Sequence, residues 1–336
     1  MVVRVALNGY GVVGKRVADA VAKQDDMQLM GVVKTSPNYE AKLAIKKGYK
    51  IYVPDAASID LFKKANVPCE GLHENLFSNC DVVVDCTPGK MGADNKKNIY
   101  IPKKLKAIFQ GGEKDTVADV SFVAQCNYDK AVNKNYVRVV SCNTTGLCRT
   151  MGAINNAFGI ESSKVVLIRR AADPNDIKTG PINSIVPETK IPSHQGPDVQ
   201  TVLPIPIETV AIKVPTTLMH VHVVFIKMKK AATTQDVKNV FANTTRIALF
   251  NAADGFESTA QLMDYARDLG RYRYDMQEIM VWEDSIYVNG NELAFIQAVH
   301  NESDVIPENV DAIRAMFNLC DAKTSIDKTN KSFGIK

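Results

Sequence analysis

The sequence predicts an α/β protein of two domains: an N-terminal, doubly wound parallel sheet, followed by an α+β domain with a mostly antiparallel sheet. Two observations predict this. In the first third, short apolar runs alternate with amphipathic stretches, which is the pattern of βαβ units. After about residue 162 the strands become longer, and alternation with helices stops. The length of 336 residues is sufficient for two cores of ordinary size.

The elements of the first domain follow from apolar periodicity. Its helices show apolar residues three and four apart, and its strands are short and rich in Val and Ile. Strands that alternate with helices favour right-handed crossovers and an open sheet. We predict strands over 2–8, 27–34, 81–88, 106–112 and 137–141, and helices over 13–24 and 39–47.

The second domain is predicted from longer β-rich runs. Residues 172–206, which are rich in Pro, Asn, Ser and Gly, form a long loop of the kind that is usually functional or mobile. Pro307 begins a helix within about 302–336, a segment expected to return to the first domain. We therefore expect domain boundaries of 1–141 with 302–336, and 142–301. The predicted strands cover 164–171, 209–214, 218–229 and 285–290, and the predicted helices cover 234–243 and 259–270.

Composition narrows the class of function. The net charge of +4 is mild and its basic residues are dispersed, which argues against nucleic acid and suits an anionic substrate. No run of about 18 apolar residues indicates a membrane span, and the first residues enter a strand without a leader, so a cytoplasmic protein is expected. Seven cysteines without a C-x-x-C pair indicate neither a disulfide framework nor a structural metal site.

A glycine motif after the first strand predicts a dinucleotide site. Gly9, Gly11 and Gly14 form G-x-G-x-x-G between a strand and a helix, the arrangement of a Rossmann domain. Such glycines permit a tight turn and close approach to a pyrophosphate, which the helix N-terminus favours. The alternative is a turn that serves only helix–sheet packing.

The end of the second strand indicates which cofactor is bound. An NAD site usually carries an acid there for the ribose 2′-hydroxyl. Here Lys34 and Thr35 offer a cation and a hydroxyl, which suit the 2′-phosphate of NADP. We predict that NADP is accepted and preferred, and that NAD is also used. The alternative is an ordinary solvated lysine at a strand end.

Cys142 is the candidate nucleophile. It lies in V-S-C-N-T-T-G-L-C between a strand and a predicted helix, where amide donors favour a thiolate and an oxyanion. His220 and His222 share one face of a strand, so one could activate Cys142 while the other is structural. Cys148 is expected to be a packed apolar residue. Two readings compete: Cys142 as an inert buried thiol, and H-x-H as a metal site, for which a third ligand is missing.

These segments resemble the archaeal glyceraldehyde-3-phosphate dehydrogenases. The resemblance runs from about residue 2 to residue 330 and includes D-C-T-P, I-F-Q-G-G-E-K, V-S-C-N-T-T-G-L-C-R, G-P-I-N, S-H-Q-G-P-D-V, V-P-T-T-L-M-H-V-H and Q-A-V-H-N-E-S-D. It implies phosphorylating oxidation of D-glyceraldehyde 3-phosphate with NAD(P) and inorganic phosphate, through a thiohemiacetal and a thioester on Cys142. His220 would be the base. The product would be 1,3-bisphosphoglycerate.

The resemblance also implies further contacts and a homotetramer. It adds cofactor contacts at Val12, Val13, Gly112, Arg170 and Asn301. Substrate contacts fall on Ser141, Asn143, His194 and Gln195. Arg169, Arg170 and His194 are candidate donors to the two phosphates, and Arg170 is favoured over its neighbour because successive residues of a strand point to opposite faces.

Two other functions use the same features. Semialdehyde and acyl-phosphate dehydrogenases combine a dinucleotide domain with a cysteine and a histidine, but S-H-Q-G-P-D and V-P-T-T-L-M-H argue against them. A non-catalytic, dinucleotide-binding regulatory protein would leave Cys142 and His220 without a role.

Overall fold

The computed structural model describes residues 1–171 and 183–335. The chain forms two compact units. Unit 1 consists of Met1–Ser141 and Ile306–Gly334, and unit 2 contains Cys142–Val305. The segment that joins unit 1 near the C-terminus thus begins at residue 306, a few residues later than the sequence pattern indicated.

Unit 1 contains a seven-stranded sheet in which every pairing is parallel. The strand order is β3-β2-β1-β4-β5-β7-β6, so the chain reverses its direction of travel across the sheet between β1 and β4. The predicted doubly wound parallel sheet is therefore confirmed. Its strands are β1 (Val3–Asn8), β2 (Met27–Val33), β3 (Ile51–Tyr52), β4 (Val82–Asp85), β5 (Lys106–Phe109), β6 (Val120–Phe122) and β7 (Tyr136–Val139).

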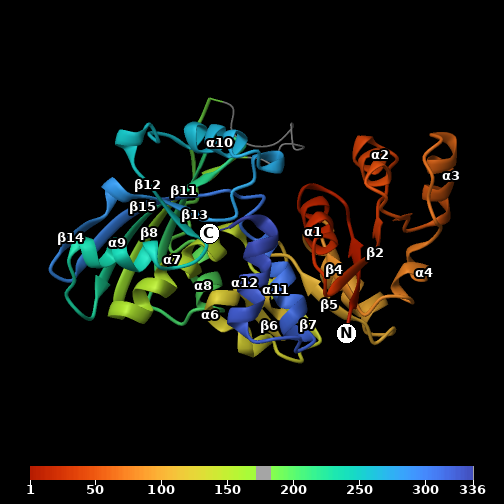
Figure 1. The fold of residues 1–336 in the computed structure, drawn as a ribbon, viewed down its shortest axis with the longest axis horizontal. Helices are drawn as coiled ribbons and strands as arrows, with labels where there is room; N and C mark the ends of the chain where they lie inside the picture. Colours follow the sequence, from red (N-terminus) through yellow and green to blue (C-terminus); the bar gives the residue numbers. More distant parts are fainter. Residues whose placement is uncertain (172–182, 336) are drawn as a thin grey trace. The chain divides into compact units, whose positions relative to one another are not determined.

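The helices of unit 1 include two from the end of the chain. Arg314 on α11 is fully buried, and its guanidinium donates to both carboxylate oxygens of Asp26, just before β2, at 2.8 and 3.0 Å. This paired contact fastens the C-terminal helices, coloured blue in Figure 1, to the N-terminal sheet. The helices are α1 (Val12–Ala22), α2 (Tyr39–Lys46), α3 (Ala56–Lys64), α4 (His73–Phe77), α5 (Met91–Asn95), α6 (Ala124–Asn127), α11 (Ile306–Met316) and α12 (Ala322–Phe333).

Unit 2 contains an eight-stranded mixed sheet. The β8–β10 and β12–β13 pairs are parallel, whereas the other pairs are antiparallel, which confirms a mostly antiparallel sheet. The order is β12-β13-β15-β11-β8-β10-β9, with β14 against β15. Its strands are β8 (Ile160–Arg170), β9 (Val186–Pro187), β10 (Glu208–Val214), β11 (His220–Met228), β12 (Ile247–Phe250), β13 (Ile279–Trp282), β14 (Tyr287–Asn289) and β15 (Glu292–Val299).

Helices cover the two faces of this sheet unequally. Helix α7 (Cys142–Phe158) packs on the face that carries His222, where a Cβ at Gly146 would lie only 2.7 Å from Val299. Helix α10 (Thr259–Asp268) covers one end of the opposite face, because its Leu262 packs in a cluster with Ala298. Helix α9 (Thr234–Ala242) is the other long helix of this unit (Figure 1).

The predicted long loop contains regular structure. Helix α8 (Gln195–Gln200) and β9 lie in its described part, so the expectation of an irregular segment is wrong there; residues 172–182 lie outside the described residues. The G-P-D within α8 looks like a loop in isolation, but Thr144 of α7 donates to Asp198 of α8 at 2.5 Å and supports the short helix. In the ranges 1–171 and 183–335, no helix has the length and apolar character needed to cross a membrane.

Candidate active site

The glycine loop lies at the point where the strand order of unit 1 reverses. Gly9 follows β1 with φ of +103°, and a Cβ there would lie 2.7 Å from the carbonyl oxygen of Cys86, just after β4. A Cβ on Gly14 would lie 2.1 Å from the carbonyl oxygen of Gly9. At Gly11, which precedes α1, no described atom outside its chain neighbours comes within 4 Å of such a Cβ. Among the described residues, no side chain caps the N-terminus of α1 with a hydrogen bond. The loop thus leaves room and amide donors for a pyrophosphate.

Lys34 contacts the glycine loop, but a carboxylate also holds it. Its Nζ donates to the carbonyl oxygen of Tyr10 at 3.2 Å and to Oε2 of Glu40 at 2.6 Å. Lys15 donates to the same carboxylate at 3.2 Å. Burial opposes ionisation of Glu40, yet the two lysines outweigh it and hold the Glu40 pKa below its ordinary value. The sequence interpretation found no acid here because Glu40 comes from α2 and not from the end of β2. Thr35 is exposed.

Cys142 is the first residue of α7, as the sequence pattern predicted. Its side chain is only partly exposed, and burial, with the charge of Asp304, raises the pKa of its thiol to about 12. Arg170, the backbone N–H of Asn143 and Arg169 act in the opposite direction and favour the thiolate. Cys148 is fully buried, and all seven cysteines are free thiols. The site therefore contains a largely protonated thiol with cationic groups around it.

His220 is the first residue of β11 and is almost completely buried. The backbone N–H of Arg170 donates to its Nδ1 at 3.0 Å. Since that N–H only donates, the neutral ring carries its own proton on Nε2. Burial lowers the pKa of His220 well below its ordinary value, and the charges of Arg170 and Arg169 add to this effect. The ring is therefore neutral, with its proton on Nε2.

The residue before His220 has an unusual conformation. Met219 has φ of +67°, a left-handed conformation that is unfavourable for a side chain of this kind. Its N–H donates to Oδ1 of Asn301 at 3.0 Å, which holds the turn in place. The buried Nδ2 of Asn301 has no hydrogen-bond partner among the described residues.

The predicted anion-binding residues share one carboxylate that sequence reasoning missed. Arg169 lies 3.6 Å from Glu188, and Nδ1 of His194 lies 3.2 Å from the same carboxylate. His194 is exposed, whereas its neighbour Gln195 is 1% exposed. Both polar atoms of the Gln195 side chain lack a hydrogen-bond partner within residues 1–171 and 183–335. A buried amide without partners is costly in free energy, which sets Gln195 apart from its exposed neighbour.

The other residues predicted to bind the cofactor or the substrate are distributed over both units. Asn143 contacts the sulfur of Cys142, with Nδ2 3.8 Å from Sγ. Ser141 is the last residue of the first segment of unit 1, and Gly112 lies in the same unit, where a Cβ would be 3.6 Å from Gly89. Val12 and Val13 form the first turn of α1. In the described ranges, no group of three or more His, Cys, Asp or Glu side chains is arranged to hold a metal ion.

The chain is similar over its full length to known glyceraldehyde-3-phosphate dehydrogenases. It is 58% identical over 335 residues to the protein of Thermococcus kodakarensis, with 100% of this chain and 99% of the relative covered. The protein of Pyrococcus furiosus is 57% identical over 335 residues with the same coverage, and that of Methanothermus fervidus is 51% identical over 333 residues, with 98% of each chain covered. This chain belongs to the glyceraldehyde-3-phosphate dehydrogenase family. It is accordingly an oxidoreductase that uses a nicotinamide dinucleotide.

Two further comparisons agree with the family. Residues 141–285 match the family model described as glyceraldehyde 3-phosphate dehydrogenase, C-terminal domain. Aspartate semialdehyde dehydrogenase II from Vibrio cholerae superposes with a TM-score of 0.67, covering 94% of this chain and 97% of that chain. Its sequence identity is only 14%, so it supports the two-domain fold and not the semialdehyde reading.

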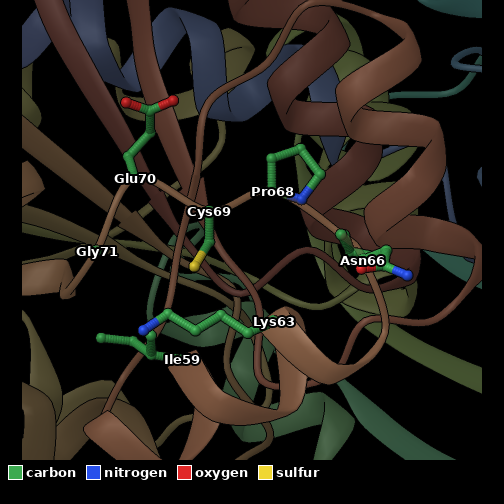
Figure 2. Close-up of a pocket in the computed structure, with 8 residues that line it drawn as sticks. Ile59, Lys63, Asn66, Pro68, Cys69, Glu70 and Gly71 are labelled. Atoms are coloured by element: carbon green, nitrogen blue, oxygen red, sulfur yellow. The ribbon is translucent and has the colours of Figure 1, made fainter.

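A separate pocket lies at the edge of unit 1. Figure 2 shows this hollow of about 510 Å³, in which Lys63, Cys69 and Glu70 are among the lining residues. It contains none of the residues predicted for the cofactor or the substrate. We therefore assign it no part in the chemistry of the glyceraldehyde-3-phosphate dehydrogenase.

Proposed function

We propose that this chain catalyses the phosphorylating oxidation of D-glyceraldehyde 3-phosphate by NAD(P) and inorganic phosphate, giving 1,3-bisphosphoglycerate in the glycolysis or gluconeogenesis of the cytoplasm. The observation that carries the proposal is the position of Cys142 at the start of α7, where the charge of Arg170 favours its thiolate. The chain is also similar over its full length to glyceraldehyde-3-phosphate dehydrogenases. Unit 1 would be the dinucleotide-binding domain, and unit 2 would be the catalytic domain.

Cys142 would be the nucleophile. Its sulfur forms a bond to the aldehyde carbon while the carbonyl oxygen gains a proton, which gives a thiohemiacetal. The backbone N–H groups at the start of α7 stabilise negative charge on the sulfur and on that oxygen. Arg170 and Arg169 favour the thiolate against the burial that opposes it.

His220 would move the proton. Nε2–H donates a hydrogen bond to the substrate oxygen in the tautomer that the Arg170 N–H imposes. To act as the base for the hydroxyl proton, the ring must instead present a lone pair at Nε2 and hold its proton on Nδ1, which requires the Arg170 contact to open. When bound, the nicotinamide ring supplies the acceptor for the hydride that the substrate carbon loses. Cys142 then carries a thioester.

Inorganic phosphate would release the product. A phosphate oxygen attacks the thioester carbon, the carbon–sulfur bond breaks, and the thiolate of Cys142 is restored. Arg169, Arg170, His194 and the buried amide of Gln195 are proposed as donors to the two phosphates, with Ser141 and Asn143 beside the nucleophile. The cofactor residues would be Gly9, Gly11, Val12, Val13, Gly14, Lys34, Thr35, Gly112, Arg170 and Asn301.

An absorbance assay tests the proposal. Purified protein is mixed with D-glyceraldehyde 3-phosphate and NADP or NAD, with and without inorganic phosphate. We expect steady formation of reduced cofactor that depends on phosphate, and a single stoichiometric burst without it. Steady turnover without phosphate would indicate a non-phosphorylating enzyme, and no reduction with either cofactor would reject the substrate assignment.

The lysine cluster predicts how cofactor preference responds to Glu40. Lys34 and Lys15 share one carboxylate, so the cluster carries a net positive charge, which supports NADP as the preferred cofactor. Replacing the carboxylate in Glu40→Gln releases both ammonium groups toward a 2′-phosphate. We expect the ratio of the NAD Kd to the NADP Kd to rise by about tenfold, or ~1.4 kcal/mol. Lys34→Met should lower the same ratio.

A matched control uses a charge change on the same helix. Lys46 is exposed on α2, so Lys46→Met alters net charge without altering the cluster, and it should leave the ratio unchanged. The measurement is titration of each cofactor by calorimetry. If the ratio is the same in Glu40→Gln and in the wild type, the lysine cluster does not bind the 2′-phosphate.

We also propose that the chain forms a homo-oligomer, as the resemblance implies a tetramer. The face of the unit 2 sheet opposite α7 carries mostly apolar side chains at paired positions on β8, β11 and β15, beyond the end that α10 covers. Val166, Val223 and Ile296 form one row and are partly exposed. Lys164, Phe225 and Ala294 form the next row, in which Lys164 and Phe225 are exposed. Phe225 and Tyr287 are 49% and 63% exposed. An apolar sheet face of this kind is typical of a protein–protein interface.

A charge on this face should weaken assembly. Phe225→Glu places a carboxylate in the apolar rows, and we expect the mass in light scattering to fall from about four times the chain mass to that of a dimer or monomer. Leu61→Glu is the matched control, because Leu61 on α3 is similarly exposed, at 51%, but belongs to unit 1. If Phe225→Glu retains the wild-type mass at micromolar concentration, this face is not the interface.

A further inference from the structure

A chain of three buried side chains leads to the sulfur of Cys142. Gln297 on β15 lies with Nε2 3.1 Å from Nδ1 of His222. The Nε2 of His222 lies 2.9 Å from Oδ1 of Asn143, and the Nδ2 of Asn143 lies 3.8 Å from Sγ of Cys142. Asn143 is 4% exposed, and His222 and Gln297 are fully buried. Water is therefore excluded from most of this series of three side chains.

The donors and acceptors of these three side chains allow the hydrogen bonds to run in one direction only. Burial, with a smaller contribution from Arg169, lowers the pKa of His222 to about 3, so its ring is neutral at physiological pH. The Oδ1 of Asn143 only accepts, so Nε2 of His222 carries the proton and Nδ1 accepts from the amide of Gln297. Each group thus donates to the next, and the last donor, Nδ2 of Asn143, faces the sulfur.

The backbone keeps the three groups in place. His222 and Gln297 are directly paired in the antiparallel β11–β15 register. Gly146 lets α7 approach this part of the sheet, because a Cβ there would be 2.7 Å from Val299 and 3.6 Å from Nε2 of Gln297. The first turn of α7 therefore packs against β15, the strand that carries Gln297, where the series of hydrogen bonds begins.

We propose that His222 and Gln297 are positioning residues for the reaction: with Asn143 they form a one-way hydrogen-bond chain that aims an amide donor at the sulfur of Cys142. Amide donors favour the charged form of sulfur and fix its direction. The second histidine of H-x-H thereby acquires a role different from that of His220. The inference rests on the proposed role of Cys142 as nucleophile.

Charged side chains near the sulfur of Cys142 have opposing effects on its ionisation, so an additional amide donor can shift the balance toward the thiolate. Asp304, which follows β15, disfavours the thiolate, and Arg169 and Arg170 at the end of β8 favour it. The variants below change none of these three residues. Any shift in the titration of the thiol would therefore come from the hydrogen-bond chain and not from a new charge.

The test compares two replacements of His222. His222→Gln keeps a donor near the place of Nε2, whereas His222→Leu removes it. We expect His222→Leu to shift the pH profile of Cys142 alkylation by iodoacetamide about one unit upward and to lower kcat about tenfold, with little change in KM. His222→Gln should restore most of both. Mass spectrometry identifies the alkylated cysteine.

Two further variants keep the test decisive if His222→Leu unfolds. Gln297→Met removes the donor to Nδ1 and should give a smaller shift in the same direction. Val224→Ala, on the same strand and also fully buried, should lower stability without moving the alkylation profile. An unchanged profile in Gln297→Met, and in His222→Leu where that variant folds, would overturn the positioning role. By contrast, wild-type inactivation that does not follow alkylation of Cys142 would reject the proposed nucleophile itself.

Discussion

Cys142→Ser is expected to lower kcat by about 10⁴-fold or more, because a serine hydroxyl in this position lacks both the acidity and the nucleophilicity of a thiol. The donors at the start of α7 help a thiolate, but a hydroxyl at the same place remains protonated at any practical pH. The stoichiometric burst of reduced cofactor without phosphate should also disappear, since no thioester forms. The measurement is pre-steady-state absorbance with D-glyceraldehyde 3-phosphate in excess.

Cys148→Ala provides the matched control on the same helix. Cys148 is fully buried, so its replacement leaves a small cavity and should lower the unfolding temperature by a few degrees. We expect kcat within about threefold of the wild type, because the residue belongs to the packed side of α7. If Cys142→Ser retains a burst, or if Cys148→Ala abolishes it, the assignment of the nucleophile is wrong.

The parts of the protein that could be predicted from sequence depend on local pattern. The glycine loop and Cys142 each sit between a strand and a helix, and such junctions are visible in a few consecutive residues. The doubly wound sheet followed for the same reason, from strands that alternate with helices. Strand β15 was missed although it pairs with β11 over eight positions, because its run of Leu, Ala, Phe and Ile lies in a helix-like composition.

The parts that were missed depend on contacts between distant residues. Glu40 meets Lys34 only because α2 turns back toward the end of β2, so an acid was present where the strand end showed none. Gln297 and His222 lie 75 positions apart and meet only through the β11–β15 register. Glu188, which joins Arg169 and His194, has no sequence signal at all. Side-chain partners of a site require the fold, even where the site itself is evident.

His220→Asn is the second large effect and should lower kcat by about 10²- to 10⁴-fold, the usual contribution of a residue that transfers a proton in the transition state. The buried ring has its Nδ1 fixed by the Arg170 N–H, so Nε2 is the nitrogen that serves the substrate. An asparagine amide is too short to reach the position of Nε2. The measurement is kcat for the wild type and the variant at saturating phosphate.

His220→Gln separates the two roles of the ring. A glutamine amide places an N–H donor near the position of Nε2 but has no basic nitrogen. Because the Arg170 hydrogen bond makes Nε2 the donor of the neutral ring, we expect His220→Gln to be about tenfold more active than His220→Asn. Equal losses would mean that the base with its proton on Nδ1 controls the rate, and that the Arg170 hydrogen bond must open in every turnover. A loss below tenfold in both variants would remove His220 from the reaction, and the proton would then have to leave by another route.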